Sequence, residues 1–186
     1  MNIKNLKPNQ KYLRRRILEI SHQAHTSHIG SCMSAIDLIE AVYDVKEKDE
    51  RFILSNGHAG VALYVVLEKK GLFNKPSLEK FHVHPDRNAK LGIDVSTGSL
   101  GQGLPIAVGM ALADQRRKVF VMVSDGECSE GSIWEALRVA EEKRLANLYI
   151  IINANGWGAY DPISVSDLIR RLKGFCSNLK IIIVAT

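Results

Sequence analysis

The sequence of 186 residues lacks most features of secreted, zinc-stapled or membrane-spanning chains. Its three cysteines, Cys32, Cys128 and Cys176, are odd in number and form no Cys-x-x-Cys pair. This pattern suggests neither a disulfide framework nor a cysteine zinc site, and it fits a reducing compartment. No apolar run approaches the roughly 18–20 residues needed to cross a bilayer, and the N-terminus leads into a charged segment. We therefore predict a cytoplasmic protein with no membrane contact.

Aromatic residues are scarce, at 6%, which bears on the meaning of the net charge of +5. The basic residues are spread along the chain, and no stacking aromatics alternate with them, so we expect no nucleic-acid partner. The densest basic cluster is the run of arginines at 14–16, which is flanked by Leu13, Ile17 and Ile20 at helical spacing. This spacing predicts a helix with a buried apolar side and solvated arginines, or alternatively arginines that meet an acidic partner surface.

The order of elements predicts an α/β fold. An apolar fraction of 46% over 186 residues fits a single domain at 1–186 with one core. Capping-box patterns, in which a serine is followed three residues later by an acidic residue, predict helix starts at Ser34, Ser132 and Ser164. Strands are expected at 52–54, 119–123, 148–152 and 181–184, helices at 58–70, 100–115, 132–143 and 165–172, and a long loop at 81–98. Apolar strands that alternate with helices predict a three-layer, doubly wound sandwich with a mostly parallel sheet.

Polar turns follow two of these strands. Asp125 lies in the turn after the strand 119–123, and Asn155 lies in the turn after the strand 148–152. Ligands of parallel sheets collect beyond the carboxyl ends of the strands, so the two side chains are expected to approach each other there. Carboxylate and amide oxygens suit magnesium, which takes few protein ligands together with phosphates. The alternative is that both segments are ordinary turns; no P-loop or Gly-x-Gly-x-x-Gly motif follows either strand.

Five ordered segments make the sequence similar to the N-terminal, thiamine-diphosphate-binding domain of transketolases. They are SHIGS at 27–31, LSNGHA at 54–59, HPD at 84–86, STGSLGQG at 96–103 and DGECSEGSIWEA at 125–136. Asp125-Gly126, followed thirty residues later by Asn155, resembles the cofactor motif of that family, which begins Gly-Asp-Gly and ends on Asn.

The resemblance implies thiamine diphosphate as the cofactor, with magnesium, calcium or manganese as its metal. It implies that Asp125, the side chain of Asn155 and the main-chain carbonyl of Trp157 hold the metal. Contacts to the cofactor are implied for His58, Gly98, Ser99, Leu100, Gly126, Glu130 and Asn155. His28, His58 and His84 are implied to face the reacting ring, where imidazoles bind substrate hydroxyls and move protons.

Two of these implied residues also have plainer interpretations. Leu100 could be a core residue. Glu130, which the resemblance implies links the two cofactor sites of a dimer, could be an acidic residue favoured at a helix N-terminus. His22, His25 and His82 match nothing in the family pattern and receive no role.

The sequence also departs from the family pattern. Ser124 stands where the motif begins with glycine, so a shifted turn and weakened binding are expected. The family requires a pyrimidine-binding domain with an activating glutamate, for which this chain has no room. The resemblance therefore implies a partner subunit that carries this domain, in a heterodimer or heterotetramer, unless the sequence is a fragment of a longer, homodimeric enzyme.

Three functions follow as hypotheses. The first is transfer of a two-carbon ketol unit from a ketose phosphate to an aldose. The second is an acyloin-forming reaction like that of deoxyxylulose phosphate synthases. The third is a non-catalytic, transketolase-like scaffold subunit.

Overall fold

The computed structural model describes residues 6–72 and 74–185. These residues form two compact units, one within 1–45 and 57–98 and the other within 46–56 and 99–186. The single domain expected over 1–186 stays a prediction, and each unit is described by itself. Among the described residues, no helix combines the length and the apolar composition needed to cross a bilayer.

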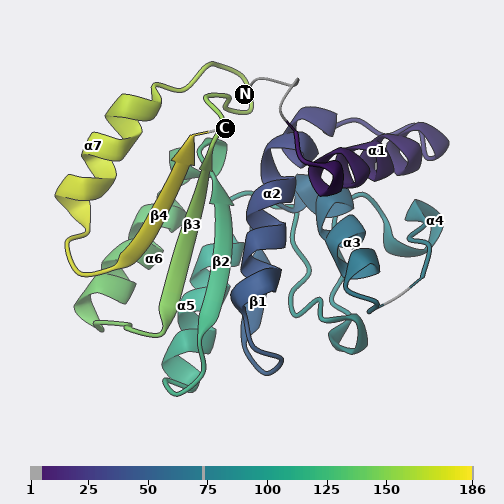
Figure 1. Cartoon of the computed structure of the whole chain (residues 1–186). Coiled ribbons are helices and arrows are strands. Elements are labelled where there is room, and N and C mark those ends of the chain that lie inside the picture. The colour runs from purple at the N-terminus through teal and green to yellow at the C-terminus, as the bar shows by residue number, and fades with distance from the viewer. Residues whose placement is uncertain (1–5, 73, 186) are drawn as a thin grey trace. The chain divides into compact units, whose positions relative to one another are not determined.

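The first unit is helical (Figure 1). Its elements are α1 (Pro8–Gln23), α2 (Ile29–Val45), η2 (Gly57–Ala59), α3 (Gly60–Lys69), α4 (Leu78–Phe81) and η3 (Ala89–Leu91). In α3, every side chain from Val61 to Leu67 is buried, as expected for a helix that is apolar all round. Helices α1 and α2 both pack against α3. The predicted helix at 58–70 is therefore confirmed, with its first turn as a 3-10 helix.

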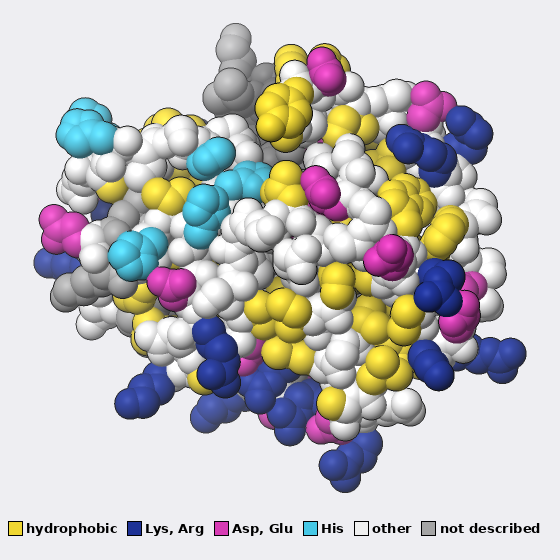
Figure 2. Space-filling model, turned by 180° about the vertical axis from the view of Figure 1, so that it is seen from behind, with side chains coloured by type: hydrophobic (Ala, Val, Ile, Leu, Met, Phe, Trp, Pro, Cys, Tyr) yellow, Lys and Arg dark blue, Asp and Glu magenta, His cyan; other side chains and the backbone are white. Residues whose placement is uncertain are grey.

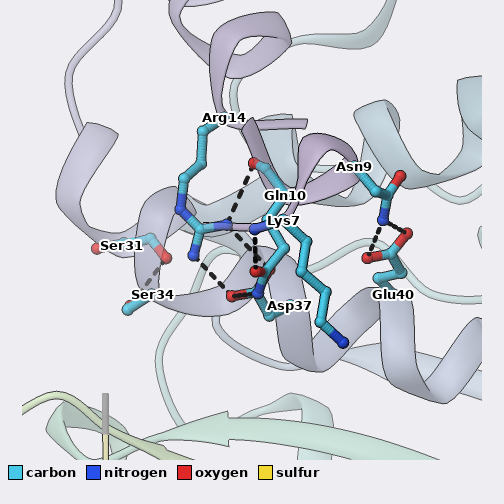
Figure 3. A network of polar contacts seen from close by, with 8 residues as sticks. All are labelled: Lys7, Asn9, Gln10, Arg14, Ser31, Ser34, Asp37 and Glu40. Atoms are coloured by element: carbon cyan, nitrogen blue, oxygen red, sulfur yellow. Dashed lines mark hydrogen bonds and ion pairs between the residues drawn. The ribbon is translucent and has the colours of Figure 1, made fainter. Parts of the chain in front are cut away.

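Arginines of α1 hold the helices of this unit together, which corrects the prediction that they are solvated. Arg14 donates to both carboxylate oxygens of Asp37 on α2, at 2.9 and 2.7 Å (Figure 3). Arg16 donates to Glu68 on α3 at 2.8 Å. Arg15 alone of the three is largely exposed. Arg14 and Arg16 are less exposed than predicted because they pair with acidic residues on other helices. The spacing of residues within α1 cannot reveal such partners.

Helix α2 begins at Ile29, five residues before the predicted start at Ser34. The hydroxyl of Ser34 donates to the carbonyl oxygen of Ser31 inside the helix. Asp37, which the box-like pattern would use as a cap, is instead the partner of Arg14. The helix starts directly after His28, whose backbone carbonyl accepts from the amide of Cys32. The prediction of a start at Ser34 was therefore wrong.

The second unit is built on a four-stranded parallel sheet in the order β1-β2-β3-β4. The strands are β1 (Arg51–Leu54), β2 (Val119–Ser124), β3 (Leu148–Ala154) and β4 (Lys180–Ala185). All of β2 and nearly all of β3 are buried, which confirms the interpretation of these apolar runs as interior strands. The register pairs Ser124 with Asn153, so β2 and β3 end side by side.

Helices α5 (Gly103–Ala113), α6 (Gly131–Glu142) and α7 (Val165–Phe175) stand along this sheet (Figure 1). Helix α5 contacts α6, and α6 meets α7 through an edge-on contact between Trp134 and Phe175. When parallel strands follow one another in sequence order and each crossover is right-handed, the connecting helices lie next to one another along the sheet. The predicted α/β fold with a parallel sheet is confirmed. Helix α5, expected to be buried, is covered on one side and exposes Ile106 and Leu112 on the other.

One of the two predicted caps in this unit is present. Ser164 accepts a hydrogen bond from the amide of Asp167 and caps α7 as predicted. Helix α6 instead has Glu130 at its N-cap position. The hydroxyl of Ser132 is used elsewhere, because it donates to the carbonyl oxygen of Gly101 at 2.9 Å. The capping box predicted at Ser132 was therefore wrong.

Candidate functional site

Asp125 joins the two turns that follow β2 and β3. Its Oδ1 accepts from the amide of Gly126 at 3.0 Å, and its Oδ2 accepts from the amide of Gly156 at 2.6 Å. The residue is 1% exposed, and burial raises the pKa of its carboxyl. The two turns therefore meet through the Asp125 side chain and the Gly156 backbone, and the approach of the Asp125 and Asn155 side chains stays a prediction. A buried carboxylate at this position would be favoured by a nearby cation.

The loop that carries Asn155 and Trp157 closes over the same turn. Asn155 Oδ1 accepts from the amide of Trp157 at 2.9 Å. The carbonyl oxygen of Trp157 lies 3.5 Å from the position that a Cβ on Gly126 would occupy. The structure thus gathers one carboxylate, one side-chain amide and one main-chain carbonyl within this unit. These oxygen donors fit a hard cation such as magnesium.

Metal clusters of another type are not found in the described part of the chain. No group of three or more His, Cys, Asp or Glu side chains there could hold an ion. The three cysteines are buried, and burial raises the pKa of each thiol. Sulfur ligation therefore has no support, and the oxygen donors after β2 and β3 remain the candidate set.

Asn56 lies just beyond β1, which pairs with β2 in the same parallel sheet, and sequence reasoning gave it no role. It is 1% exposed, and neither atom of its carboxamide has a hydrogen-bond partner among the described residues. Buried polar atoms are nearly always satisfied by protein, water or a ligand. This orphaned carboxamide is consistent with a polar ligand at this edge.

A glycine loop before α5 lies against the start of α6. Gly101 has a φ of +77°, and a Cβ there would lie 2.4 Å from Ser132 Oγ and 2.8 Å from Glu130 Cβ. Ser99 and Leu100 come just before it; Ser99 is exposed and Leu100 is partly exposed. A plain core role for Leu100 is therefore wrong. Glu130 is exposed at the N-cap position of α6. A negative charge is favourable at a helix N-terminus, and the exposed carboxylate can also contact a ligand, so both interpretations of Glu130 stand.

Glu127 is a buried acidic residue of this unit that sequence reasoning missed. It is 0% exposed and accepts hydrogen bonds from Ser55, Gly101 and Ser124. Burial raises the pKa of its carboxyl, and these three donors oppose that effect. The available signal was an acid directly after Asp125-Gly126, in the turn where a ligand site was expected.

Three histidines come together in the first unit, as predicted. The ring centroids of His28 and His58 are 5.5 Å apart, and those of His28 and His84 are 6.3 Å apart. Histidine side chains gather on the face shown in Figure 2. Burial, and then the charges of the other two imidazoles, lower the pKa of His58 to about 4. His58 is therefore neutral at pH 7, with one ring nitrogen as donor and the other as acceptor.

Backbone geometry fixes this histidine cluster, defined as His28, His58 and His84. His28 has a φ of +66°, a left-handed conformation that non-glycine residues adopt at a cost. Gly98 has a φ of +149°, and a Cβ there would lie 2.9 Å from Cγ of His84. Glycine at position 98 therefore lets the chain pass directly beside the His84 ring.

The predicted site residues therefore form two groups. His28, His58, His84 and Gly98 belong to the first unit, and Ser99, Leu100, Asp125, Gly126, Glu130, Asn155 and Trp157 belong to the second. His22, His25 and His82 lie outside the histidine cluster; His22 faces His25 with centroids 6.3 Å apart, and His82 lies 3.8 Å from Asp86.

A family model described as "Transketolase, thiamine diphosphate binding domain" matches residues 9–166, which is most of the chain. The chain belongs to the transketolase thiamine-diphosphate-binding domain family. The resemblance stated from the sequence motifs is thereby confirmed, and both groups of predicted residues lie inside the matched range.

Some curated relatives of this chain are named as subunits of transketolases. The chain is 36% identical to one such subunit, that of the apulose-4-phosphate transketolase of Phocaeicola vulgatus, covering 83% of this chain and 62% of that protein. It is 34% identical to 6-deoxy-6-sulfo-D-fructose transketolase subunit SqwG of Clostridium sp., covering 81% and 62%. The chain thus spans about three fifths of the length of these relatives.

Solved transketolases share the fold. A transketolase from Leishmania mexicana matches with a TM-score of 0.78 at 22% identity, covering 98% of this chain and 37% of that one. A transketolase from Pichia stipitis, in complex with fructose 6-phosphate, matches with a TM-score of 0.71 at 26% identity, covering 91% and 31%. These matches agree with the parallel sheet described for the second unit.

Proposed function

We propose that this chain binds thiamine diphosphate through magnesium and serves as the N-terminal subunit of a split transketolase. In this function it transfers a two-carbon ketol unit from a ketose phosphate to an aldose. The observation that carries the proposal is the hydrogen bond from the Gly156 amide to Asp125, which assembles the turns after β2 and β3. Membership of the transketolase family supports the same cofactor class.

The second unit would hold the charged end of the cofactor. Asp125, the Asn155 side-chain oxygen and the Trp157 carbonyl would coordinate the metal, with the diphosphate supplying further oxygens. Calcium and manganese favour similar donors and are alternatives to magnesium. Gly126 would approach the diphosphate closely, because it carries no side chain and sits at the turn beside Trp157. Ser99, Leu100 and Glu130 would contact the cofactor from the loop and helix start next to this turn.

The first unit would hold the substrate end. When bound, thiamine diphosphate supplies a nucleophilic carbon and accepts the electron pair released when the substrate carbon–carbon bond breaks. His28 and His84 are exposed and can donate hydrogen bonds to sugar hydroxyls. The neutral imidazole of His58 has one N–H group, which can donate a hydrogen bond to a phosphate oxygen of the cofactor. Its other ring nitrogen can accept a hydrogen bond. Gly98 would allow a flat ring to approach the backbone beside His84.

A partner subunit is part of this proposal. Several relatives are named as single subunits of a transketolase, which implies that such chains act with a second subunit. We propose that this partner carries the pyrimidine-binding domain and its activating glutamate, in a two-by-two heterotetramer. A homodimer is expected instead if the residues belong to a longer enzyme. The substrate class, a sugar phosphate, follows from the same proposal.

Calorimetric titration of the chain with thiamine diphosphate, with and without magnesium, tests the cofactor step. We expect binding that depends on magnesium and that Asp125→Asn weakens by at least about tenfold, or about 1.4 kcal/mol. Asp167→Asn is the matched control, because Asp167 is an exposed acid in the first turn of α7. Magnesium-independent binding, or equal binding by both variants, would contradict the proposed metal set.

Activity with a partner subunit that copurifies separates the possible reactions. Consumption of a ketose phosphate that depends on an aldose acceptor would support ketol transfer. Decarboxylation of pyruvate would instead indicate an acyloin-forming enzyme. Cofactor binding without either reaction would indicate a scaffold subunit.

A further inference from the structure

Glu127 lies at the meeting point of three chain segments of the second unit. Its Oε1 accepts from the hydroxyl of Ser55 at 2.7 Å and from the amide of Gly101 at 2.9 Å. Its Oε2 accepts from the amide of Ser124 at 3.1 Å. Ser55 directly follows β1, Gly101 lies in the loop before α5, and Ser124 ends β2. One fully buried carboxylate therefore fastens three segments that are far apart in the sequence.

The loop before α5 depends on this carboxylate for its conformation. Both backbone groups of Gly101 are bound by side chains, the amide by Glu127 and the carbonyl by Ser132 at 2.9 Å. The close fit of Gly101 against Ser132 leaves the loop no room for a side chain at this position. Ser99 and Leu100 directly precede Gly101, so the position of these two residues follows from how Gly101 is held.

The turn that carries Asp125 depends on the same carboxylate. The amide of Ser124 donates to Glu127, and the hydroxyl of Ser124 accepts from the amide of Glu127 at 3.2 Å. This reciprocal pair spans Asp125 and Gly126 and closes the turn around them. A shift of Glu127 would therefore move Asp125 relative to Gly156.

We propose that Glu127 is a positioning residue for the cofactor site, which ties the Ser99–Leu100 loop to the Asp125 turn. The proposal rests on the function proposed above. Glu127 acts through the residues it holds, because the hydrogen bonds of its carboxylate go to Ser55, Gly101 and Ser124. Positioning partners of this kind typically change ligand affinity by about 10- to 100-fold when they are lost.

Glu127→Gln tests the proposal with little change in volume. A glutamine has one acceptor oxygen, so its amide nitrogen must face the Ser124 amide in one orientation, or the Gly101 amide and the Ser55 hydroxyl in the other. Either orientation leaves at least one buried donor without an acceptor. We expect thiamine diphosphate affinity in the presence of magnesium to fall about tenfold, at the lower end of the range for such partners.

Asn147→Ala is the control for simple destabilisation. Asn147 is buried just before β3, at the opposite end of that strand, and its Nδ2 lies within hydrogen-bond distance of the carbonyls of Ala111, Asp114 and Arg117. Both variants should lower the urea unfolding midpoint. We expect only Glu127→Gln to weaken the cofactor. Loss of affinity in both variants, or in neither, would overturn the positioning role.

Amide hydrogen exchange in the cofactor-free chain provides a second readout. The amides of Gly101 and Ser124 should be protected in the wild type and exchange faster in Glu127→Gln, while Asn147→Ala leaves them protected. Rapid exchange of both amides in the wild type would show that their hydrogen bonds to Glu127 do not persist in solution, and would overturn the positioning role. If the wild type binds no cofactor, the proposed function fails and the positioning role fails with it. If the wild type binds and Glu127→Gln binds equally well, only the positioning role fails.

Discussion

Acidification is a sharp test of the histidine cluster, because the pKa of His58 lies at about 4 in the folded chain against an ordinary value of 6.5. Between these two pH values the unfolded chain binds more protons than the folded chain. The contribution of His58 to stability is therefore complete above pH 6.5 and declines as the pH falls towards 4. This is the direction expected when burial and neighbouring imidazoles oppose protonation.

The magnitude follows from the same two values. Ionisation near pH 4 when folded and near pH 6.5 when unfolded lowers the free energy of unfolding by about 2 kcal/mol between pH 7 and pH 5. His58 is only partly buried, so solvent screening reduces this figure to about 1 kcal/mol. His58→Gln removes the titrating group while it keeps a polar side chain of similar reach. The variant should lose about 1 kcal/mol less than the wild type over this pH range.

Urea unfolding followed by circular dichroism at pH 7 and pH 5 measures the difference. His22→Gln, the loss of an exposed histidine outside the cluster, is the matched control. Equal losses in the wild type and in His58→Gln would refute the reasoning. So would a nuclear magnetic resonance titration in which the His58 ring protonates near pH 6.5.

Two further predictions concern other parts of the structure. Gly98→Ala should lower the free energy of unfolding in urea by about 1–3 kcal/mol, because φ is +149° and the new Cβ would meet the His84 ring. Gly109→Ala, with open space around an exposed helical glycine, should instead be neutral or stabilising by up to about 1 kcal/mol, and equal effects of the two changes would contradict this account. The three buried cysteines should react with a thiol reagent at pH 8 far more slowly in the folded chain than in urea. Burial raises the thiol pKa values to about 11, 12 and 11 for Cys32, Cys128 and Cys176, and rapid labelling of folded protein would show that these thiols are accessible.

The strands were predictable from the sequence to within about two residues at each end. Each is a run of branched apolar residues, and turn formers such as Ser55 after β1 and Asp125 after β2 mark the ends. Strand ends also indicated which turns lie together, and the hydrogen bond from the Gly156 amide to the Asp125 side chain confirms that these two turns meet. The histidine cluster came from the family resemblance, because no local pattern connects residues 28, 58 and 84.

Long-range partners were not predictable. Ser34 and Ser132 both look like helix caps, yet one hydroxyl bonds inside a helix and the other bonds to Gly101. Arg14 belongs to a basic run, yet it pairs with Asp37 on the next helix. Glu127 follows the same rule, because its donors reach back as far as Ser55. For Ser132, Arg14 and Glu127, a polar side chain had several plausible local roles, and the tertiary fold selected a partner that local spacing does not show.

Ser124 has a consequence for how relatives of this chain can be recognised. Its φ is not positive, and its hydroxyl accepts from the Glu127 amide and helps to close the turn around Asp125. Nothing in this backbone conformation demands glycine, so a small hydroxyl residue fills the position without strain. A search pattern that insists on Gly-Asp-Gly would pass over this chain, whereas one that accepts serine at the first place would find it.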